Sequence, residues 1–213
     1  GGIGSIEQCH DIILERGPRR VSPFFVPGSI INMIAGNLSI KYGFAGPNLA
    51  LATACTTGTH CIGLAARLIA CGDADAMVAG GAEMATTPVG LGGFAAARAL
   101  STRNDDPKRA SRPYDVDRDG FVLSDGAGVL VLEEMEHAKA RGARIYAEVI
   151  GYGANSDGDN MVAPSGEGAV RCMQQAMATI DEPVDYINAH GTSTPVGDMR
   201  ELEAVGKVFG DDI

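Results

Sequence analysis

Short apolar runs rich in valine, isoleucine and alanine alternate along the chain with segments of helical periodicity. This alternation is typical of α/β proteins, in which helices pack on the faces of a sheet. The pattern predicts strands near 48–54, 75–80, 127–133, 145–152 and 185–189. It predicts helices near 29–42, 56–70, 134–141, 167–179 and 198–208.

Glycines and one polar stretch divide this pattern. Gly43, Gly72 and Gly142 each follow a predicted helix, as expected of glycines that end helices in the left-handed conformation. The stretch 101–113 holds too many charged residues and turn formers for a core element, so we expect a long surface loop. We place a domain boundary just after Gly142, which separates 1–144 from 145–213.

The composition fits a globular protein, because 213 residues of which 45% are hydrophobic can bury a sizeable core. The net charge of −10 argues against general nucleic-acid binding, although a local basic patch can still bind an acidic partner. The five cysteines are odd in number and include no Cys-x-x-Cys pair, which predicts a reduced, cytoplasmic setting.

The chain carries no sequence signal for export or for a membrane. It has no signal-peptide pattern and no apolar stretch long enough to cross a bilayer. The sequence starts at Gly1 without an initiator methionine and stops at Ile213 just after a helical pattern, and we expect an internal fragment of a longer protein.

Cys55 is the strongest candidate for a nucleophile. It ends the apolar run 48–54 and precedes small, hydroxylated residues that begin a predicted helix. If the chain turns sharply there, the sulfur lies where backbone N–H groups and the helix dipole stabilise negative charge. A cysteine after an apolar strand can equally be a small buried hydrophobe, and the residues around Cys55 leave both interpretations open.

His190 is the second candidate, since an apolar strand runs there into a loop of small hydroxylated residues. The carboxyl ends of parallel strands meet at one crevice, so we expect Cys55 and His190 to open onto a common cavity. A thiol and an imidazole in one cleft indicate acyl chemistry, with the imidazole as a base or, as we favour, as a hydrogen-bond donor. A structural role for His190 is the alternative.

Other residues give weaker signals. His60 follows Cys55 by five positions, which on a helix turns its side chain about 140° away, while His10 and His137 lie in polar helical surroundings. The run 115–120 opens like a calcium loop, but Gly126 stands where a glutamate is required. No P-loop, zinc spacing or dinucleotide fingerprint is present, so we expect neither a metal nor a resident cofactor.

Four groups of residues stand out by their order and spacing. They are Thr53-Ala-Cys55-Thr-Thr-Gly58, Ala79-Gly-Gly-Ala-Glu83, Arg112-Pro-Tyr-Asp115 with Arg118-Asp-Gly-Phe121, and Asn188-Ala-His190-Gly-Thr-Ser-Thr-Pro195 with Gly197, Asp198 and Glu201. Together they resemble the β-ketoacyl-acyl carrier protein synthases over essentially the whole chain. Up to about Gly142 the sequence is more similar to the KAS II branch, and 161–190 is closer to KAS I.

The resemblance implies a thiolase-like layered α/β fold of two related halves, of which this chain holds the later part of the first and the start of the second. It implies a 3-oxoacyl-[acyl-carrier-protein] synthase of fatty acid biosynthesis, an acyltransferase that performs a decarboxylative Claisen condensation. Cys55 would carry the acyl group as a thioester, with its backbone N–H as an oxyanion donor. His190 would hydrogen-bond the malonyl thioester carbonyl, and Thr192 and Thr194 would support its loop.

The sequence also departs from that family. It ends before the family's second active-site histidine, its lysine and the glycine-rich segment that completes the oxyanion hole. Because losing one oxyanion donor typically costs about a hundred-fold to a thousand-fold in rate, we expect the fragment alone not to elongate acyl chains.

The resemblance implies acyl carrier protein as the partner, which brings its own phosphopantetheine arm. Arg16, Arg19, Arg20 and Arg98 match positions that line the carrier docking face in similar synthases, and ordinary solvated surface is the alternative. A homodimer is implied as well, with the strand before Cys55 pairing across the two-fold axis.

Three other functions stay open. The chain could belong to the ketosynthase domain of a polyketide synthase, which shares this chemistry. It could be a non-catalytic partner subunit, although the presence of Cys55 argues against that role. A Cys-His hydrolase is the third possibility, for which the sequence has no protease or esterase signature.

Overall fold

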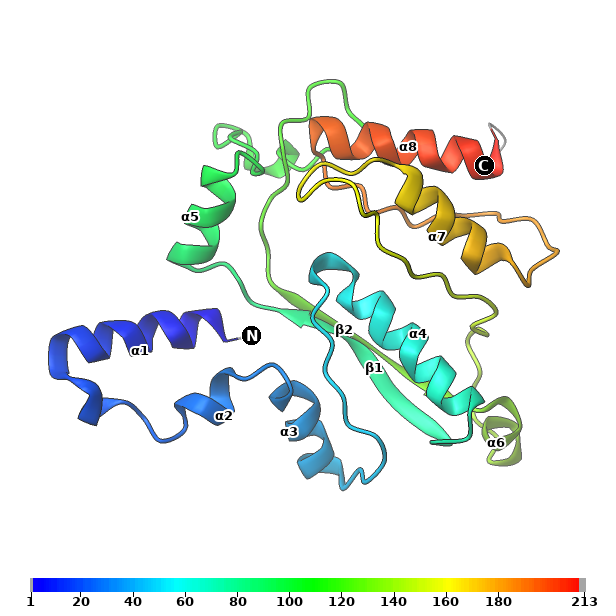
Figure 1. The fold of residues 1–213 in the computed structure, drawn as a ribbon, viewed down its shortest axis with the longest axis horizontal. Helices are drawn as coiled ribbons and strands as arrows, with labels where there is room; N and C mark the ends of the chain where they lie inside the picture. Colours follow the sequence, from blue (N-terminus) through cyan, green and yellow to red (C-terminus); the bar gives the residue numbers. More distant parts are fainter. Residues whose placement is uncertain (1, 211–213) are drawn as a thin grey trace. The chain divides into compact units, whose positions relative to one another are not determined.

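The structure, a computed structural model, describes residues 2–210. The chain forms two compact units. The first comprises the residues up to Gly92 together with Ser124–Ala147, and the second comprises Gly93–Leu123 together with the residues from Glu148 onward. Figure 1 shows the helices and strands coloured along the sequence.

A two-stranded sheet forms the centre of the first unit. β1 (Ala76–Glu83) and β2 (Gly126–Glu133) pair in antiparallel fashion along their whole length. α4 (Thr57–Ala70) lies along this ribbon in Figure 1 and packs against β1, and Ala65 of α4 and Ala79 of β1 are both buried. The strands predicted near 75–80 and 127–133 are confirmed. They pair in antiparallel fashion, however, whereas the expectation that Cys55 and His190 meet assumed a parallel sheet.

Three other predicted strands are wrong. Apart from Ala54, the residues of 48–54 carry no helix or strand, and the same holds for 145–152 and 185–189. Within residues 2–210, β1 and β2 pair only with each other. A strand exists only where its N–H and C=O groups form a ladder with a neighbour, so an apolar run without such a neighbour is not one.

The predicted helices are present with shifted ends. The structure has α3 (Met33–Tyr42), α4, α6 (Met135–Ala140), α7 (Glu167–Met177) and α8 (Pro195–Phe209), and the first of them is preceded by the short α2 (Phe25–Ser29). The glycines predicted to end helices are confirmed as left-handed, with φ of +70° at Gly43, +81° at Gly72 and +67° at Gly142. No helix among the described residues is both long and apolar enough to cross a membrane.

Among the described residues, the sequence missed α1 (Ile3–Arg16) and α5 (Pro88–Ala96) as well as the short α2. α5 contains several glycines, which are poor helix formers. Its start is held from a distant part of the chain, because the Glu7 carboxylate of α1 accepts the Thr87 hydroxyl at 2.7 Å and the Val89 N–H at 2.8 Å. A local sequence pattern does not contain such a contact.

The second unit is built around α7 and α8, which pack together, and Val170 of α7 and Ala204 of α8 are both buried. Lys207 on α8 also binds Glu167 on α7, with 2.6 Å between Nζ and Oε1. The surface loop predicted at 101–113 is confirmed, because its only regular element is the 3-10 turn Pro107–Arg109. The loop is closed at its base by Phe121, which bridges to Leu100 in the backbone.

Candidate functional site

Cys55 lies in a tight turn at the start of α4. The 3-10 turn Ala54–Thr56 leads directly into the helix at Thr57. Ala54 has a φ of +52°, and a left-handed conformation costs a non-glycine residue on the order of 1–3 kcal/mol. The chain therefore does turn sharply at Ala54–Cys55, which is the condition for the nucleophile interpretation, although residues 48–53 before the turn form no strand. Strained backbone of this kind gathers at functional sites.

Two glycines let this turn approach the sheet. A β-carbon on Gly81 of β1 would lie 3.3 Å from the Cα of Gly58, which belongs to the first turn of α4. Side chains at this crossing would force the helix away from the strand, because protein interiors are already close-packed. Gly58 and Gly81 thus set how closely the Cys55 turn lies against β1, which explains why glycine occurs in both motifs.

Hydroxyl groups brace the Cys55 turn. The Thr57 hydroxyl accepts the Thr53 N–H at 2.9 Å and donates to the Ala54 carbonyl at 2.8 Å. The Thr56 hydroxyl donates to the Thr53 carbonyl at 2.7 Å. His60 Nδ1 shares a hydrogen bond of 2.9 Å with Thr53 Oγ1, so its ring contributes to the same network.

The surroundings of Cys55 differ from those of the other cysteines. Its side chain is exposed, and within residues 2–210 its backbone N–H donates no hydrogen bond, which leaves a donor for an anionic oxygen. Cys9 is buried, and burial raises the pKa of the Cys172 thiol. Cys71 is exposed but follows the C-terminal end of α4, where the helix dipole disfavours negative charge. Cys55 alone combines exposure with the favourable end of a helix.

The His190 loop lies in the second unit and is held by Glu201 of α8. The main-chain N–H of His190 donates to Glu201 Oε1 at 2.6 Å, and that of Gly191 donates to Glu201 Oε2 at 2.8 Å. The His190 side chain is exposed. The sequence places Glu201 in the His190 motif but does not indicate its role, because residue spacing cannot reveal that its carboxylate binds the main chain of the loop.

Thr192 and Thr194 shape the junction between this loop and α8. Thr194 is the N-cap of α8, since its hydroxyl accepts the Gly197 N–H at 3.2 Å. The same hydroxyl shares a hydrogen bond of 2.9 Å with that of Thr192. Pro195 occupies the first helical position, where a missing N–H has no consequence. These contacts fix the start of α8, and the supporting role of the two threonines in the His190 loop stays a prediction.

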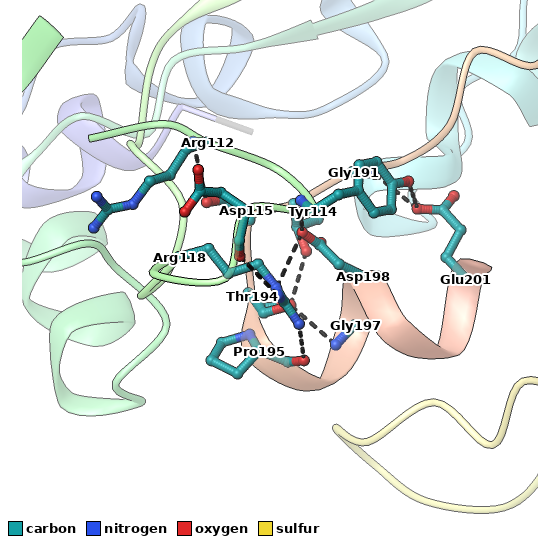
Figure 2. Close-up of polar contacts among 12 residues, drawn as sticks. Arg112, Tyr114, Asp115, Arg118, Gly191, Thr194, Pro195, Gly197, Asp198 and Glu201 are labelled. Atoms are coloured by element: carbon teal, nitrogen blue, oxygen red, sulfur yellow. Dashed lines mark hydrogen bonds and ion pairs between the residues drawn. The ribbon is translucent and has the colours of Figure 1, made fainter. Parts of the chain in front are cut away.

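A buried ion pair joins the segment 112–121 to the start of α8, as Figure 2 shows. Asp198 is fully buried; its Oδ2 lies 3.4 Å from Arg118 Nε and accepts the Tyr114 N–H at 2.7 Å. Arg118 also donates to the carbonyls of Thr194 and Pro195, at 3.1 and 2.6 Å. Because breaking a buried pair leaves an uncompensated charge, these contacts hold the two segments together.

Ser193 adds main-chain contacts between the same segments. Its carbonyl accepts the Gly120 N–H at 2.9 Å, and its hydroxyl accepts the Arg112 N–H at 3.3 Å. Gly120 has a φ of +134°, and a β-carbon there would lie 2.5 Å from the Ala99 carbonyl oxygen, so only glycine fits. Two motifs that are far apart in the sequence thus form one hydrogen-bonded assembly.

The charges in this assembly are set by Tyr114 and Glu201. Burial by itself would raise the pKa of Glu201, but the N–H groups of Gly191 and His190 and the Tyr114 hydroxyl together lower it. Burial, followed by the hydrogen bond to Glu201, raises the pKa of Tyr114 well above its usual range. Tyr114 therefore stays a protonated donor, and Glu201 stays a charged acceptor.

In the run 115–120, which opens like a calcium loop, the Asp119 carboxylate binds other groups of the protein. Asp119 accepts the Ser101 hydroxyl at 2.6 Å and the Thr102 N–H at 2.9 Å, and it lies 3.5 Å from the Arg112 guanidinium. In the part of the chain that the structure describes, no group of three or more His, Cys, Asp or Glu side chains is arranged to hold a metal ion.

The remaining predicted site residues are exposed. Arg16 ends α1, Arg19 and Arg20 form part of the 3-10 turn Pro18–Arg20, and Arg98 follows α5. Their docking role stays a prediction. Cys55 belongs to the first unit and His190 to the second, so their meeting at one cavity stays a prediction as well.

Comparison with protein families gives two matches. The family model described as "Beta-ketoacyl synthase, N-terminal domain" matches residues 2–138. The model described as "Beta-ketoacyl synthase, C-terminal domain" matches residues 146–213. The two matches follow one another along the chain in the order that the motifs indicated.

Curated relatives carry the name 3-oxoacyl-[acyl-carrier-protein] synthase. The synthase 2 of Vibrio cholerae serotype O1 is 61% identical over 99% of this chain, and that of Rhizobium meliloti is 57% identical over 99%. The mitochondrial synthase of Arabidopsis thaliana is 51% identical over 99%. The matches cover 52%, 52% and 48% of these relatives, so the chain spans about half the length of the curated relatives it matches.

Solved structures of ketosynthases are also similar to this chain. A beta-ketoacyl synthase from Burkholderia phymatum STM815 superposes with a TM-score of 0.92 at 39% identity, covering 99% of this chain and 52% of the other. The ketosynthase of a complex titled "type II PKS acyl-carrier protein in complex with its ketosynthase bound to the hexaketide" gives 0.91 at 33% identity, covering 97% and 53%. The α/β fold predicted from the resemblance is thereby confirmed.

Proposed function

The chain belongs to the beta-ketoacyl synthase family, and on this premise we propose that it is part of a 3-oxoacyl-[acyl-carrier-protein] synthase of fatty acid biosynthesis. One observation carries the proposal, namely the strained turn that presents the exposed Cys55 thiol at the start of α4. The identity of 61% to a synthase 2 supports the choice of reaction. The reaction is a decarboxylative Claisen condensation through an acyl-cysteine.

In the first step, the Cys55 sulfur attacks the thioester carbonyl of an acyl group on acyl carrier protein. A new C–S bond forms to Cys55, the bond to the carrier's pantetheine sulfur breaks, and that sulfur takes up the proton given up by the thiol. The positive end of α4 favours the attacking thiolate. The free N–H of Cys55 stabilises the tetrahedral oxyanion.

In the second step, a malonyl group on a second carrier loses carbon dioxide. The electron pair of the broken C–C bond passes into the thioester as an enolate, and His190 donates a hydrogen bond to the enolate oxygen. The enolate carbon attacks the acyl carbonyl on Cys55, the bond to the Cys55 sulfur breaks, and the 3-oxoacyl group leaves on the carrier. A donor suits this step better than a base, because the developing oxyanion is the costly species.

The proposed partner is acyl carrier protein, loaded with an acyl or a malonyl group. The similar polyketide ketosynthase is described in complex with its acyl-carrier protein, which supports this class of partner. The exposed Arg16, Arg19, Arg20 and Arg98 offer positive charge to an acidic protein. The pantetheine arm comes with the carrier, so the proposal includes no resident cofactor. It does include a homodimer and a cytoplasmic location.

The ketosynthase of a polyketide synthase is the second candidate. The polyketide ketosynthase structure supports it, with a TM-score of 0.91. Its identity of 33% is well below the 61% shared with the 3-oxoacyl-[acyl-carrier-protein] synthase 2 of Vibrio cholerae serotype O1, so fatty acid synthesis is the better supported assignment. Both candidates use the same acyl-cysteine chemistry.

The test follows the acyl group in the full-length protein. After incubation with acyl carrier protein bearing a saturated acyl chain, we expect mass spectrometry to place the acyl group on Cys55. Cys55→Ser should abolish this adduct, whereas Cys71→Ser should not, because Cys71 is exposed at the opposite end of the same helix. Acylation of another residue, or a normal adduct in Cys55→Ser, would refute the assignment.

Addition of malonyl carrier protein tests the second step. The acylated wild-type enzyme should release carbon dioxide and a 3-oxoacyl carrier. The same assay checks our expectation that residues 1–213 alone turn over no substrate, since steady product from them would contradict it.

A further inference from the structure

The Glu201 carboxylate gathers three hydrogen bonds from two distant segments. Oε1 accepts the His190 N–H at 2.6 Å, and Oε2 accepts both the Gly191 N–H at 2.8 Å and the Tyr114 hydroxyl at 2.9 Å. Figure 2 shows the Tyr114 ring directed at this carboxylate. Hydrogen bonds to a charged acceptor are about twice as strong as neutral ones, so the main chain at His190 is held firmly.

Tyr114 is itself fixed at both ends. Its N–H donates to the buried Asp198, which pairs with Arg118, and its hydroxyl reaches Glu201 less than one helical turn further along α8. Its φ of +64° lies in the left-handed region, which a bulky aromatic residue adopts only when its surroundings enforce it. The phenol therefore reaches Glu201 from a backbone that has no freedom to move away.

Helix α8 does not need Glu201 for its own start. The N-cap is supplied by Thr194, and the acidic residue of the first turn is Asp198. Among the described residues, no lysine or arginine forms an ion pair with Glu201. The three hydrogen bonds that Glu201 accepts therefore hold the His190 loop and Tyr114, and they are not needed to start the helix.

We propose that Glu201, oriented by the Tyr114 hydroxyl, is a positioning residue that fixes the main chain at His190 and Gly191 and thereby aims the His190 imidazole at the malonyl thioester. Gly191 has a φ of +48°, in a region open to glycine without strain, so the loop needs an external constraint. Glu201 acts through the backbone and touches no substrate. The inference rests on the proposed function and deepens it.

The experiment separates the two half-reactions in the full-length enzyme. Glu201→Gln keeps the size of the side chain but places an NH₂ group against one of the two N–H donors. We expect decarboxylation and condensation to slow by about ten-fold or more, since bonds to a charged group are lost. The rate of Cys55 acylation and the KM for both carriers should stay within about two-fold of wild type, because His190 acts only in the second step.

Two further variants sharpen the test. Tyr114→Phe removes only the phenol donor and should slow condensation by a few-fold, about the loss expected for one hydrogen bond. Glu203→Gln is the matched control, because Glu203 lies on the same helix and, among residues 2–210, pairs only with the exposed Arg200. This control should retain wild-type rates in both steps.

The outcomes distinguish this inference from the proposed function. If Glu201→Gln condenses at the wild-type rate, the positioning role is wrong. If it loses acylation and condensation together with a lower melting temperature, Glu201 is only structural, and the positioning role is again wrong. If His190→Ala condenses normally, the proposed function itself fails, whatever the Glu201 variants do.

Discussion

Strained residues mark both parts of the candidate site. Four non-glycine residues among 2–210 have a positive φ, and Ala54, Tyr114 and Ser193 are three of them. Ala54 precedes the candidate nucleophile, while Tyr114 and Ser193 belong to the assembly around the His190 loop. The sequence could indicate Cys55 and His190 through the residue types around them, but it could not indicate this strain, because positive φ is a property of the folded backbone.

The strain at Ala54 can be tested by substitution. Ala54→Gly should leave the melting temperature of the full-length protein unchanged or raise it slightly, because glycine adopts a φ of +52° without a steric penalty. Ala54→Val should lower it, because a β-branched residue is an outlier there. Ala66→Gly, inside α4, is the control and should destabilise by about 0.5–1 kcal/mol. A stabilising valine would show that the turn is not strained.

At the scale of elements, α8 organises the His190 side of the site. Thr194 caps it, Asp198 receives the Tyr114 N–H, and Glu201 holds the His190 loop. Helices such as α4 and α7 could be predicted from periodicity, because most of their hydrogen bonds are local. The strands expected near 145–152 and 185–189 could not be decided in this way, because strands depend on partners elsewhere.

The cap of α8 gives a prediction at this scale. Thr194→Ala should destabilise the protein by about 1 kcal/mol, because the Gly197 N–H loses its acceptor. Thr194→Ser keeps the hydroxyl and should remain close to wild type. Thermal unfolding of the three full-length proteins measures the difference. Equal melting temperatures for the alanine and serine variants would mean that the cap contributes nothing.

The junction of β2 and α6 predicts a pH dependence. The Arg141 guanidinium binds both Glu133 oxygens at 2.6 Å, and His137 Nδ1 lies 2.6 Å from Oε1. The hydrogen bonds from Arg141 and then His137 lower the pKa of Glu133 from 4.5 to about 2. Because folding lowers the pKa of Glu133, its charged carboxylate stabilises the folded protein at pH values above 4.5. This contribution is lost as the pH falls from 4.5 toward 2.

Glu133→Gln should therefore be less stable than wild type near neutral pH, and the difference should shrink as the pH drops through that window. Urea unfolding at a series of pH values measures it. Glu136→Gln is the control for losing one carboxylate from the same region, because Glu136 is 76% exposed and pairs with Lys139. A difference that grows on acidification would have the wrong sign and would contradict the account.

At the scale of the whole molecule, the chain follows its family closely but spans about half of its relatives. The motifs predicted the family correctly, because each retains residue types that its local geometry requires, such as Gly58 at the crossing of α4 and β1. The antiparallel pairing of β1 and β2 was not foreseen, because the alternation of apolar runs carries no information on strand direction.

The docking surface gives a prediction at this scale. Changing both Arg19 and Arg20 to glutamate in the full-length enzyme should weaken binding of acyl carrier protein, and most strongly at low salt, because charge attraction is screened by ions. Lys41→Glu on α3 is a control for a charge change on the same unit. Surface plasmon resonance at several salt concentrations measures the affinity. An unchanged affinity at low salt would remove these arginines from the docking surface.

We predict that the Cys55 thiol and the His190 imidazole face one cavity in the full-length enzyme. A 1,3-dihaloacetone alkylates a thiol first and then bridges to a group within the reach of three carbons. We predict that peptide mass spectrometry finds Cys55 and His190 joined by this bridge in the wild-type protein, and no bridge in Cys55→Ser. Alkylation of Cys55 with the second arm attached to another residue would contradict the account.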